Sequence, residues 1–179
     1  LYLYMDGARL GYALTCDEND LDLPFIADCC DVFYIGGTKQ GALFGEAVVI
    51  TRDELKKDFR YMIKQKGGML AKGRLLRLQF QVLFEDNLYF QLARHANETA
   101  AFLRKSISGA GYSFLIPSPT NQQFPILPTD LLAELQKKYV YSNSQRIDEN
   151  HSAVRLCTSW ATKWEDVKQL ARDIEGYNE

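Results

Sequence analysis

The residues best suited to chemistry gather around Lys39, which lies in the glycine-rich stretch GGTKQGALFG at residues 36–45. Apolar, strand-like runs flank this stretch at residues 32–35 and 47–50, so the lysine is expected in a loop between two strands. Thr38 adds a hydroxyl beside the amine. A lysine held partly away from water in such a loop has a lowered pKa and attacks carbonyl groups more readily. The plain structural alternative is a surface hairpin with a solvated lysine.

Asp6 and Arg155 carry the charges that would complement such a lysine. Asp6 ends a strand-like run, and a short proline-led helix separates that run from the next strand at residues 31–35. This strand–helix–strand order predicts parallel strands, with Asp6 and Lys39 at the same edge of the sheet. Arg155 lies in the apolar run AVRLC, where its planar guanidinium suits a two-point grip on a carboxylate. A turn aspartate and a structural ion pair are the alternatives.

Together the three groups ask for one chemistry. A loop lysine can form an imine, a carboxylate at a strand end can hold a pyridinium protonated, and a separate arginine can hold a substrate carboxylate. That set describes a pyridoxal 5′-phosphate site for a small amino acid substrate.

Composition excludes several other classes of protein. The 179 residues contain 21 Lys and Arg against 23 Asp and Glu, which gives no electrostatic case for nucleic acid or an acidic membrane. No apolar run is long enough for a membrane span. The four cysteines lack metal-site spacing and fit a reducing cytoplasm, where we expect the protein to act. With two histidines, no metal site is predicted.

The periodicity of apolar residues predicts an α/β part followed by a smaller α+β part. Residues 1–108 are expected to end in one long helix over residues 75–107, preceded by a charged helix over residues 52–66. His95 is expected to be a packing or surface residue. Residues 109–179 are expected to form a separate small domain. Its predicted strands are residues 112–116, 122–127 and 153–158, and its predicted helices are residues 129–138 and 162–175, capped by Thr129 and Thr162, with Trp164 packed on the sheet.

Five sequence blocks carry a more specific resemblance: MDGARL, YIGGTKQGALFGEAVVI, KQKGGMLAKGRLLRLQF, SPTNQQF and AVRLCTSWATKWEDV. In this order they resemble the low-specificity L-threonine aldolase branch of the β-eliminating lyase superfamily, among the fold type I pyridoxal-phosphate enzymes. The resemblance runs over residues 1–174. It implies the C-terminal part of a fold type I transferase-like large domain, followed by a small α+β C-terminal domain.

The resemblance also assigns cofactor contacts. Lys39 looks like the lysine that holds the cofactor as an imine and later moves protons at the substrate Cα. Asp6 resembles the partner of the pyridine nitrogen, and Arg9 resembles the arginine near the ring's 3-hydroxyl. Thr38 and Lys72 are the remaining expected cofactor contacts. Lys72 is expected to approach the cofactor phosphate, either in its own subunit or in a neighbouring one.

The implied reaction cleaves the Cα–Cβ bond of β-hydroxy-α-amino acids, such as L-threonine or L-allo-threonine, to glycine and acetaldehyde. Arg155 matches the arginine that binds the substrate α-carboxylate. The resemblance implies a homodimer or homotetramer with shared active sites. The chain opens without methionine and lacks the front of the family's large domain, so we expect the isolated chain to bind the cofactor poorly and to be inactive.

Three alternatives remain open at the level of sequence. The same frame supports other pyridoxal-phosphate reactions, such as β-elimination. A phosphate- or nucleotide-binding module built on GGTKQG is a second, although the GxxxxGK[ST] layout is absent and Arg155 would be unexplained. A catalytically inactive binding or scaffold homologue is the third.

Overall fold

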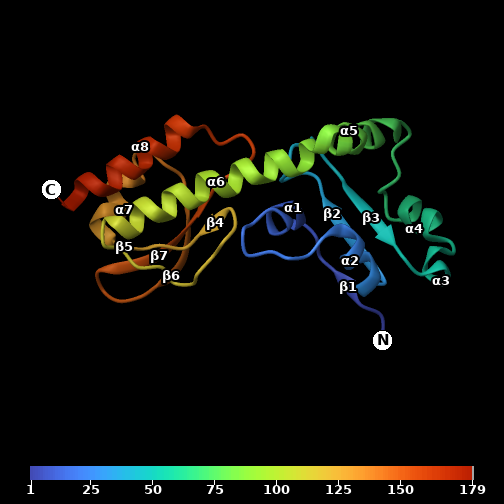
Figure 1. Ribbon diagram of the computed structural model, residues 1–179, viewed down its shortest axis with the longest axis horizontal. Coiled ribbons are helices and arrows are strands. Elements are labelled where there is room, and N and C mark those ends of the chain that lie inside the picture. Colours follow the sequence, from blue (N-terminus) through green and yellow to red (C-terminus); the bar gives the residue numbers. More distant parts are fainter. Residues whose placement is uncertain (179) are drawn as a thin grey trace. The chain divides into compact units, whose positions relative to one another are not determined.

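The computed structural model describes residues 1–178, which divide into two compact units (Figure 1). Unit 1 comprises residues 1–15 and 19–92, and unit 2 comprises residues 16–18 together with the chain from residue 93. Helix α6 (Leu88–Gly109), the long green helix of Figure 1, contributes to both units. The expected boundary after residue 108 coincides with the end of this helix, and as a domain boundary it stays a prediction. The described residues contain no helix long and apolar enough to cross a membrane.

Unit 1 is built on a three-stranded sheet in the order β1 (Tyr4–Met5), β2 (Val32–Gly36), β3 (Glu46–Ile50). Strands β1 and β2 are parallel, with Met5 opposite Phe33, whereas β2 and β3 are antiparallel. The parallel pair confirms the expected strand–helix–strand unit. Since parallel strands end at one edge, the residues that follow β1 and β2 are brought to the same side of the sheet.

Two short helices connect β1 to β2. Helix α2 (Leu23–Cys29) has proline in its first turn, and the Asp22 carboxylate caps it by accepting a hydrogen bond from the backbone N–H of Phe25 at 2.9 Å. Helix α1 (Leu10–Leu14) was not expected from the sequence. It directly follows the DGAR motif, so it fixes where the residues of that motif lie.

The prediction of a single charged helix over residues 52–66 is wrong. The structure has two helices, α3 (Asp53–Lys56) and α4 (Phe59–Gln65). Asp58 between them has a φ of 59°. A residue in this left-handed conformation cannot continue a right-handed helix.

The single long helix expected over residues 75–107 is also wrong. Helix α5 (Arg74–Phe84) is separated from α6 by a 3-10 turn, η1 (Glu85–Asn87). Asp86 and Asn87 have φ values of 50° and 59°. The apolar spacing on both sides is helical, so periodicity alone did not reveal the break.

The core of unit 1 lies between the sheet and the helices α2, α5 and α6. Its buried members are Leu10, Ile26, Cys30, Phe33, Ile35, Ala42, Leu83 and Tyr89. Tyr89 of α6 is fully buried, and its hydroxyl donates a hydrogen bond to the carbonyl oxygen of Gly36 at 3.1 Å. The start of α6 is thereby attached to the end of β2.

Unit 2 contains a four-stranded antiparallel sheet around its longest strand, β7 (His151–Cys157). Strands β4 (Gln122–Gln123), β5 (Ile126–Pro128) and β6 (Ser142–Arg146) all pair with β7. Strand β6 was not expected from the sequence, because its five residues are polar or charged and all exposed. Such a strand carries no alternation of apolar and polar residues.

The remaining strand expectations for unit 2 need correction. The strand expected over residues 112–116 is reduced to one bridge, between Phe114 and Pro125. The strand expected over residues 122–127 is divided into β4 and β5.

Two helices complete unit 2, α7 (Thr129–Leu135) and α8 (Trp164–Glu175), followed by the 3-10 turn η2 (Gly176–Asn178). Thr129 and Thr162 do not cap them: the residues at the cap positions are Pro128 and Lys163, and neither makes a side-chain cap.

Trp164 packs against α6, with its ring centroid 5.9 Å from that of Phe102, and its expected packing on the sheet stays a prediction. His95 of α6 is half-buried and lies 2.7 Å from the carbonyl oxygen of Thr162, as expected of a packing residue. The core of unit 2 comprises Leu103, Ile107, Leu127, Leu131, Leu132, Leu135, Val154, Leu156, Val167, Ala171 and Ile174.

Candidate functional site

The loop that carries Lys39 joins β2 to β3 and is closed by a carboxylate. Glu46, the first residue of β3, accepts a hydrogen bond from the Gly37 backbone N–H at 2.6 Å and another from the Thr38 hydroxyl at 2.9 Å. Gly41 has a φ of 100°, which favours glycine. The loop is therefore ordered by its own contacts. It joins the antiparallel strands β2 and β3, so it is a hairpin loop, as the plain structural alternative has it.

The backbone of Lys39 is held from the opposite side. The hydroxyl of Tyr12, a fully buried residue of α1, donates to the carbonyl oxygen of Lys39. The next residue, Gln40, is fully buried, and its Oε1 accepts a hydrogen bond from the Gly11 backbone N–H at 3.1 Å. The Lys39 and Thr38 side chains are exposed, so burial does not withdraw the amine from water as the sequence argument expected.

Asp6 lies at the same sheet edge, as predicted. Its Oδ1 accepts hydrogen bonds from the Tyr34 hydroxyl and from the Ala8 backbone N–H, the latter at 3.0 Å. The Tyr34 bond most of all, then the Ala8 bond and the positive charge of Lys39, hold the pKa of the Asp6 carboxyl below its usual range. Asp6 is therefore ionised and feels the charge of Lys39.

Arg9 follows Asp6 in the DGAR motif and sits just before α1. It is half-buried, and its Nε atom is buried without a hydrogen-bond partner among the described residues. A buried donor of this kind costs free energy unless a ligand or water satisfies it. Lys72 is exposed in the turn before α5 and makes no ion pair with any described residue.

Arg155 belongs to unit 2, in the middle of β7. It is half-buried, and its guanidinium donates to the Ser142 hydroxyl at 3.2 Å and to Oε1 of Gln122 at 3.5 Å. Both partners are neutral residues of strands that pair with β7. Within residues 1–178, no carboxylate forms an ion pair with Arg155. The structural ion pair considered from the sequence is therefore not found, and the charge is left for an anionic ligand.

The structure thus groups five of the six expected site residues in unit 1 and places Arg155 in unit 2. Sequence reasoning missed Tyr34, Glu46 and Tyr12. Tyr34 could have been found from the sequence, because strand alternation puts it on the face opposite the buried Phe33 and Ile35. A tyrosine hydroxyl on that face is expected to have a hydrogen-bond partner. Glu46 and Tyr12 carry no comparable signal.

The donor set of unit 1 fits pyridoxal phosphate. The cofactor needs a primary amine for its aldehyde, an ionised acceptor for its ring N–H and a donor for its 3-oxygen. The exposed Lys39 amine, the ionised Asp6 carboxylate and the unsatisfied Arg9 Nε are groups of these three kinds.

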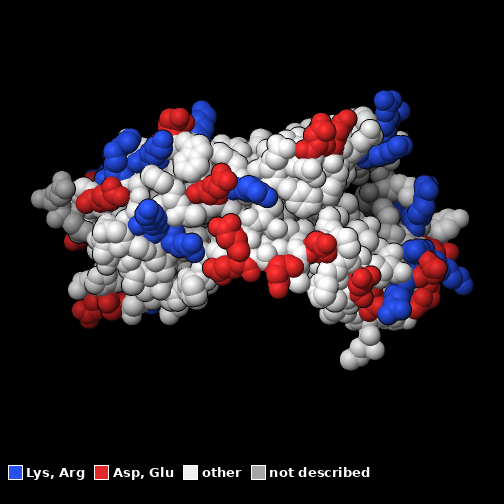
Figure 2. All heavy atoms as spheres, viewed as in Figure 1, with Lys and Arg blue, Asp and Glu red and all other residues white. Residues whose placement is uncertain are grey.

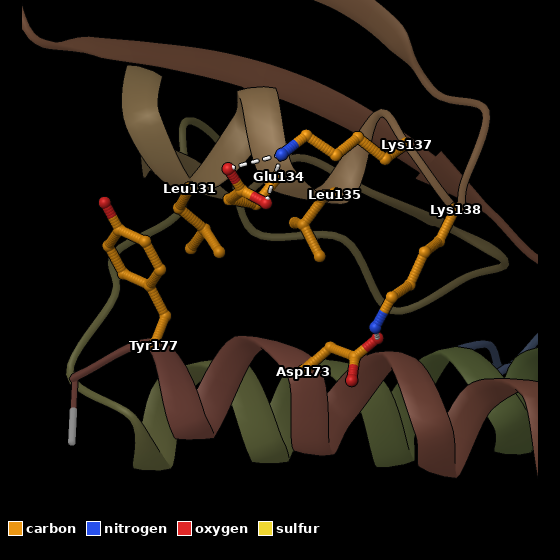
Figure 3. Close-up of a pocket in the computed structure, with 7 residues that line it drawn as sticks. All are labelled: Leu131, Glu134, Leu135, Lys137, Lys138, Asp173 and Tyr177. Atoms are coloured by element: carbon orange, nitrogen blue, oxygen red, sulfur yellow. Dashed lines mark hydrogen bonds and ion pairs between the residues drawn. The ribbon is translucent and has the colours of Figure 1, made fainter.

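A charged pocket elsewhere in unit 2 has less to offer a ligand. It measures about 150 Å³ and lies between α7 and α8 (Figure 3). Its lysines are already paired, Lys137 with Glu134 at 2.7 Å and Lys138 with Asp173 at 3.1 Å. Acidic and basic residues both occur on the face drawn in Figure 2.

Comparison with known proteins agrees with the residues found at the site. The chain is 31% identical to the low-specificity L-threonine aldolase of Pseudomonas aeruginosa over 97% of its residues. It superposes on the threonine aldolase of Leishmania major with a TM-score of 0.98 and 42% identity over its whole length. The chain is thus similar to threonine aldolases over nearly all of its residues. It spans about half the length of these relatives, 50% of the Pseudomonas protein and 52% of the Leishmania chain.

More distant structures show how widely the fold is shared. The archaeal O-phosphoseryl-tRNA(Sec) selenium transferase has a TM-score of 0.62 and 14% identity, with 97% of this chain and 44% of that chain covered. The fold is that of part of a fold type I pyridoxal-phosphate enzyme, as expected. No protein-family model matches the chain.

Proposed function

We propose that the protein is a pyridoxal-phosphate-dependent aldehyde-lyase that cleaves β-hydroxy-α-amino acids, with L-threonine or L-allo-threonine giving glycine and acetaldehyde. The observation that carries this proposal is the meeting of Lys39 and an ionised Asp6 at one sheet edge, on a chain related over its whole length to threonine aldolases. The Pseudomonas and Leishmania relatives are both named as threonine aldolases.

Each site residue has a task in this reaction. Asp6 accepts a hydrogen bond from the cofactor's ring N–H, Arg9 donates to its 3-oxygen, and Thr38 and Lys72 contact its polar groups. When bound, pyridoxal phosphate supplies an electron sink for the pair of electrons released as Cα–Cβ breaks. The amine of Lys39 would hold the cofactor. As the aldehyde forms, a base takes the proton of the substrate's β-hydroxyl, and the Lys39 amine would deliver a proton to Cα of the product glycine.

Arg155 binds the substrate α-carboxylate. Its two guanidinium hydrogen bonds run to neutral side chains, so its full positive charge is available to a carboxylate. A carboxylate held at two points fixes the orientation of the amino acid, and orientation decides which bond at Cα lies in position to break.

Assembly and compartment are part of the same proposal. We infer a homodimer or homotetramer with shared sites, supported by the apolar outer residues of α5, Leu75, Leu78 and Val82, which are all exposed. A cytoplasmic location is supported by Cys29, Cys30 and Cys157, which are free thiols. Light scattering of the purified protein measures the first, and fractionation of cells measures the second.

The activity is tested by incubating the whole protein with L-threonine and pyridoxal phosphate and measuring acetaldehyde and glycine. We expect equal amounts of both, and none from a Lys39→Ala variant. L-serine provides the second arm of the test. Formation of pyruvate and ammonia in place of glycine would indicate β-elimination and contradict the proposed cleavage.

A further inference from the structure

Tyr34 of β2 lies at this sheet edge, has no task in the proposed reaction and yet contacts the charged group of Asp6. It is half-buried, and its hydroxyl donates to Oδ1 of Asp6. This bond, together with burial, raises the pKa of Tyr34 to about 12, so the hydroxyl keeps its proton and stays a donor at neutral pH.

Both donors to Asp6 converge on the same oxygen. The Tyr34 hydroxyl and the Ala8 backbone N–H both bind Oδ1, and no described residue donates a hydrogen bond to Oδ2. A carboxylate tied at one oxygen cannot rotate freely about its Cβ–Cγ bond. Its second oxygen is then held toward one direction with its acceptor capacity unused.

We propose that Tyr34 is a positioning residue: with the Ala8 N–H it ties down Oδ1 of Asp6 so that Oδ2 is presented to the ring N–H of a bound pyridinium. This inference rests on the proposed function, since it names the residue that prepares Asp6 for the cofactor. The bond also stabilises the charged carboxylate, which keeps the shared proton on the ring nitrogen rather than on Asp6.

The groups that face this pair are few. Lys39 lies near Asp6 and favours its charged form, whereas Glu46 and Tyr4 lie near Tyr34 and disfavour its ionisation. Tyr4 of β1 offers a matched control. Its ring centroid is 6.4 Å from that of Tyr34, it is exposed, and no hydrogen bond joins it to Asp6 within the described chain.

The test compares Tyr34→Phe with Tyr4→Phe, since both remove a hydroxyl and keep the ring. Carbon-13 NMR of labelled aspartate side chains in the cofactor-free protein gives the pKa of Asp6, assigned with an Asp6→Asn variant. We expect Tyr34→Phe to raise this pKa toward the ordinary aspartate value and Tyr4→Phe to leave it unchanged. Equal Asp6 pKa values in wild type and Tyr34→Phe would overturn the inference.

Cofactor affinity is the second measurement. We expect Tyr34→Phe to raise the dissociation constant of pyridoxal phosphate about threefold to tenfold, as for the loss of one hydrogen bond. In an Asp6→Asn background the same change is expected to have no further effect, because Tyr34 acts only through Asp6. An undiminished effect in that background would contradict the positioning role.

The two proposals fail in different ways. If the wild-type protein forms no cofactor adduct on Lys39, the proposed function and this inference both fall. An adduct on Lys39 combined with unchanged cofactor affinity in Tyr34→Phe leaves the proposed function standing and overturns this inference alone.

Discussion

At the scale of a single residue, Arg155 carries a positive charge that forms no ion pair with a carboxylate of the described chain. Arg155 is half-buried in the apolar run AVRLC of β7, and within the described chain its guanidinium hydrogen bonds run to neutral side chains. Burying part of a charge is unfavourable unless an opposite charge or water compensates. In the proposed reaction, the substrate carboxylate would provide that compensation.

We expect Arg155→Lys to weaken binding of glycine, the proposed product, by about tenfold or more. Lysine keeps the charge but loses the planar fork, and a hydrogen bond to a charged group contributes about 1.5–3 kcal/mol. Calorimetric titration of the cofactor-loaded whole protein measures the change. Arg146→Lys is the control, since Arg146 of β6 is exposed and its Nε donates only to a backbone carbonyl. Equal affinity in Arg155→Lys and wild type would exclude Arg155 from the carboxylate site.

Some site residues could be named from the sequence, whereas their contacts could not. Lys39, Asp6 and Arg155 could be named because lysine, aspartate and arginine in those settings have few explanations. The contacts of Tyr34 and Glu46 depend on which side chains the sheet brings together. That depends on the register of the strands, which no local sequence motif predicts. The site residues therefore stay predictions, and the structure adds the neighbours that hold them.

At the scale of elements, the close approach of the DGAR turn to β2 positions Asp6. A Cβ atom on Gly7 would overlap the carbonyl oxygen of Tyr34. We expect Gly7→Ala to lower the free energy of unfolding by about 3 kcal/mol, because the backbone must move to admit the methyl group. Gly109→Ala, at the end of α6 where a Cβ would meet no atom within 4 Å, serves as the control. Urea denaturation measures both, and a neutral Gly7→Ala would refute the close contact.

Asp31 ties the strands of unit 1 together and predicts a pH dependence of stability. Its carboxylate accepts hydrogen bonds from Arg52 Nε and from the Leu3 backbone N–H, each at 2.6 Å. These bonds, the Arg52 bond foremost, lower the pKa of Asp31 in the folded state. A lowered pKa means that the contribution is present above the ordinary aspartate pKa and is lost as pH falls through the folded value.

We therefore expect Asp31→Asn to lower the melting temperature at pH 7, and the gap from wild type to narrow as the pH falls below about 3.9. Asp53→Asn is the control. Asp53 pairs with Lys56 on an exposed helix, where an ion pair contributes little. Thermal unfolding followed by circular dichroism measures all three proteins. A gap that stays constant down to acidic pH would show that the Asp31 charge does not carry the effect.

Elements differ in how far they can be predicted. The parallel pair β1–β2 followed from apolar runs and a helix with proline in its first turn, which are local signals. The breaks at Asp58 and at Asp86–Asn87 did not, because Asp and Asn tolerate a positive φ but adopt it at only a few of their positions, so their presence does not mark a break. Strand β6 was missed because its pairing with β7 stabilises a segment that has no buried face of its own.

At the scale of the whole molecule, length is the decisive fact. The chain spans about half of its threonine aldolase relatives. We expect the 179 residues expressed by themselves to bind pyridoxal phosphate weakly and to release no acetaldehyde from L-threonine, because about half of each relative has no counterpart among these residues. Equilibrium dialysis and an aldehyde assay measure these quantities. Threonine cleavage by the isolated chain would contradict this expectation.

The central claim is that Lys39 carries the cofactor, and one measurement addresses it directly. The whole protein is incubated with pyridoxal phosphate, reduced with borohydride, digested and mapped by mass spectrometry. The account predicts a pyridoxyl group on the peptide that contains Lys39, and its loss in Lys39→Ala. An adduct on another lysine, or none at all, would contradict the account and favour a binding or scaffold protein on the same fold.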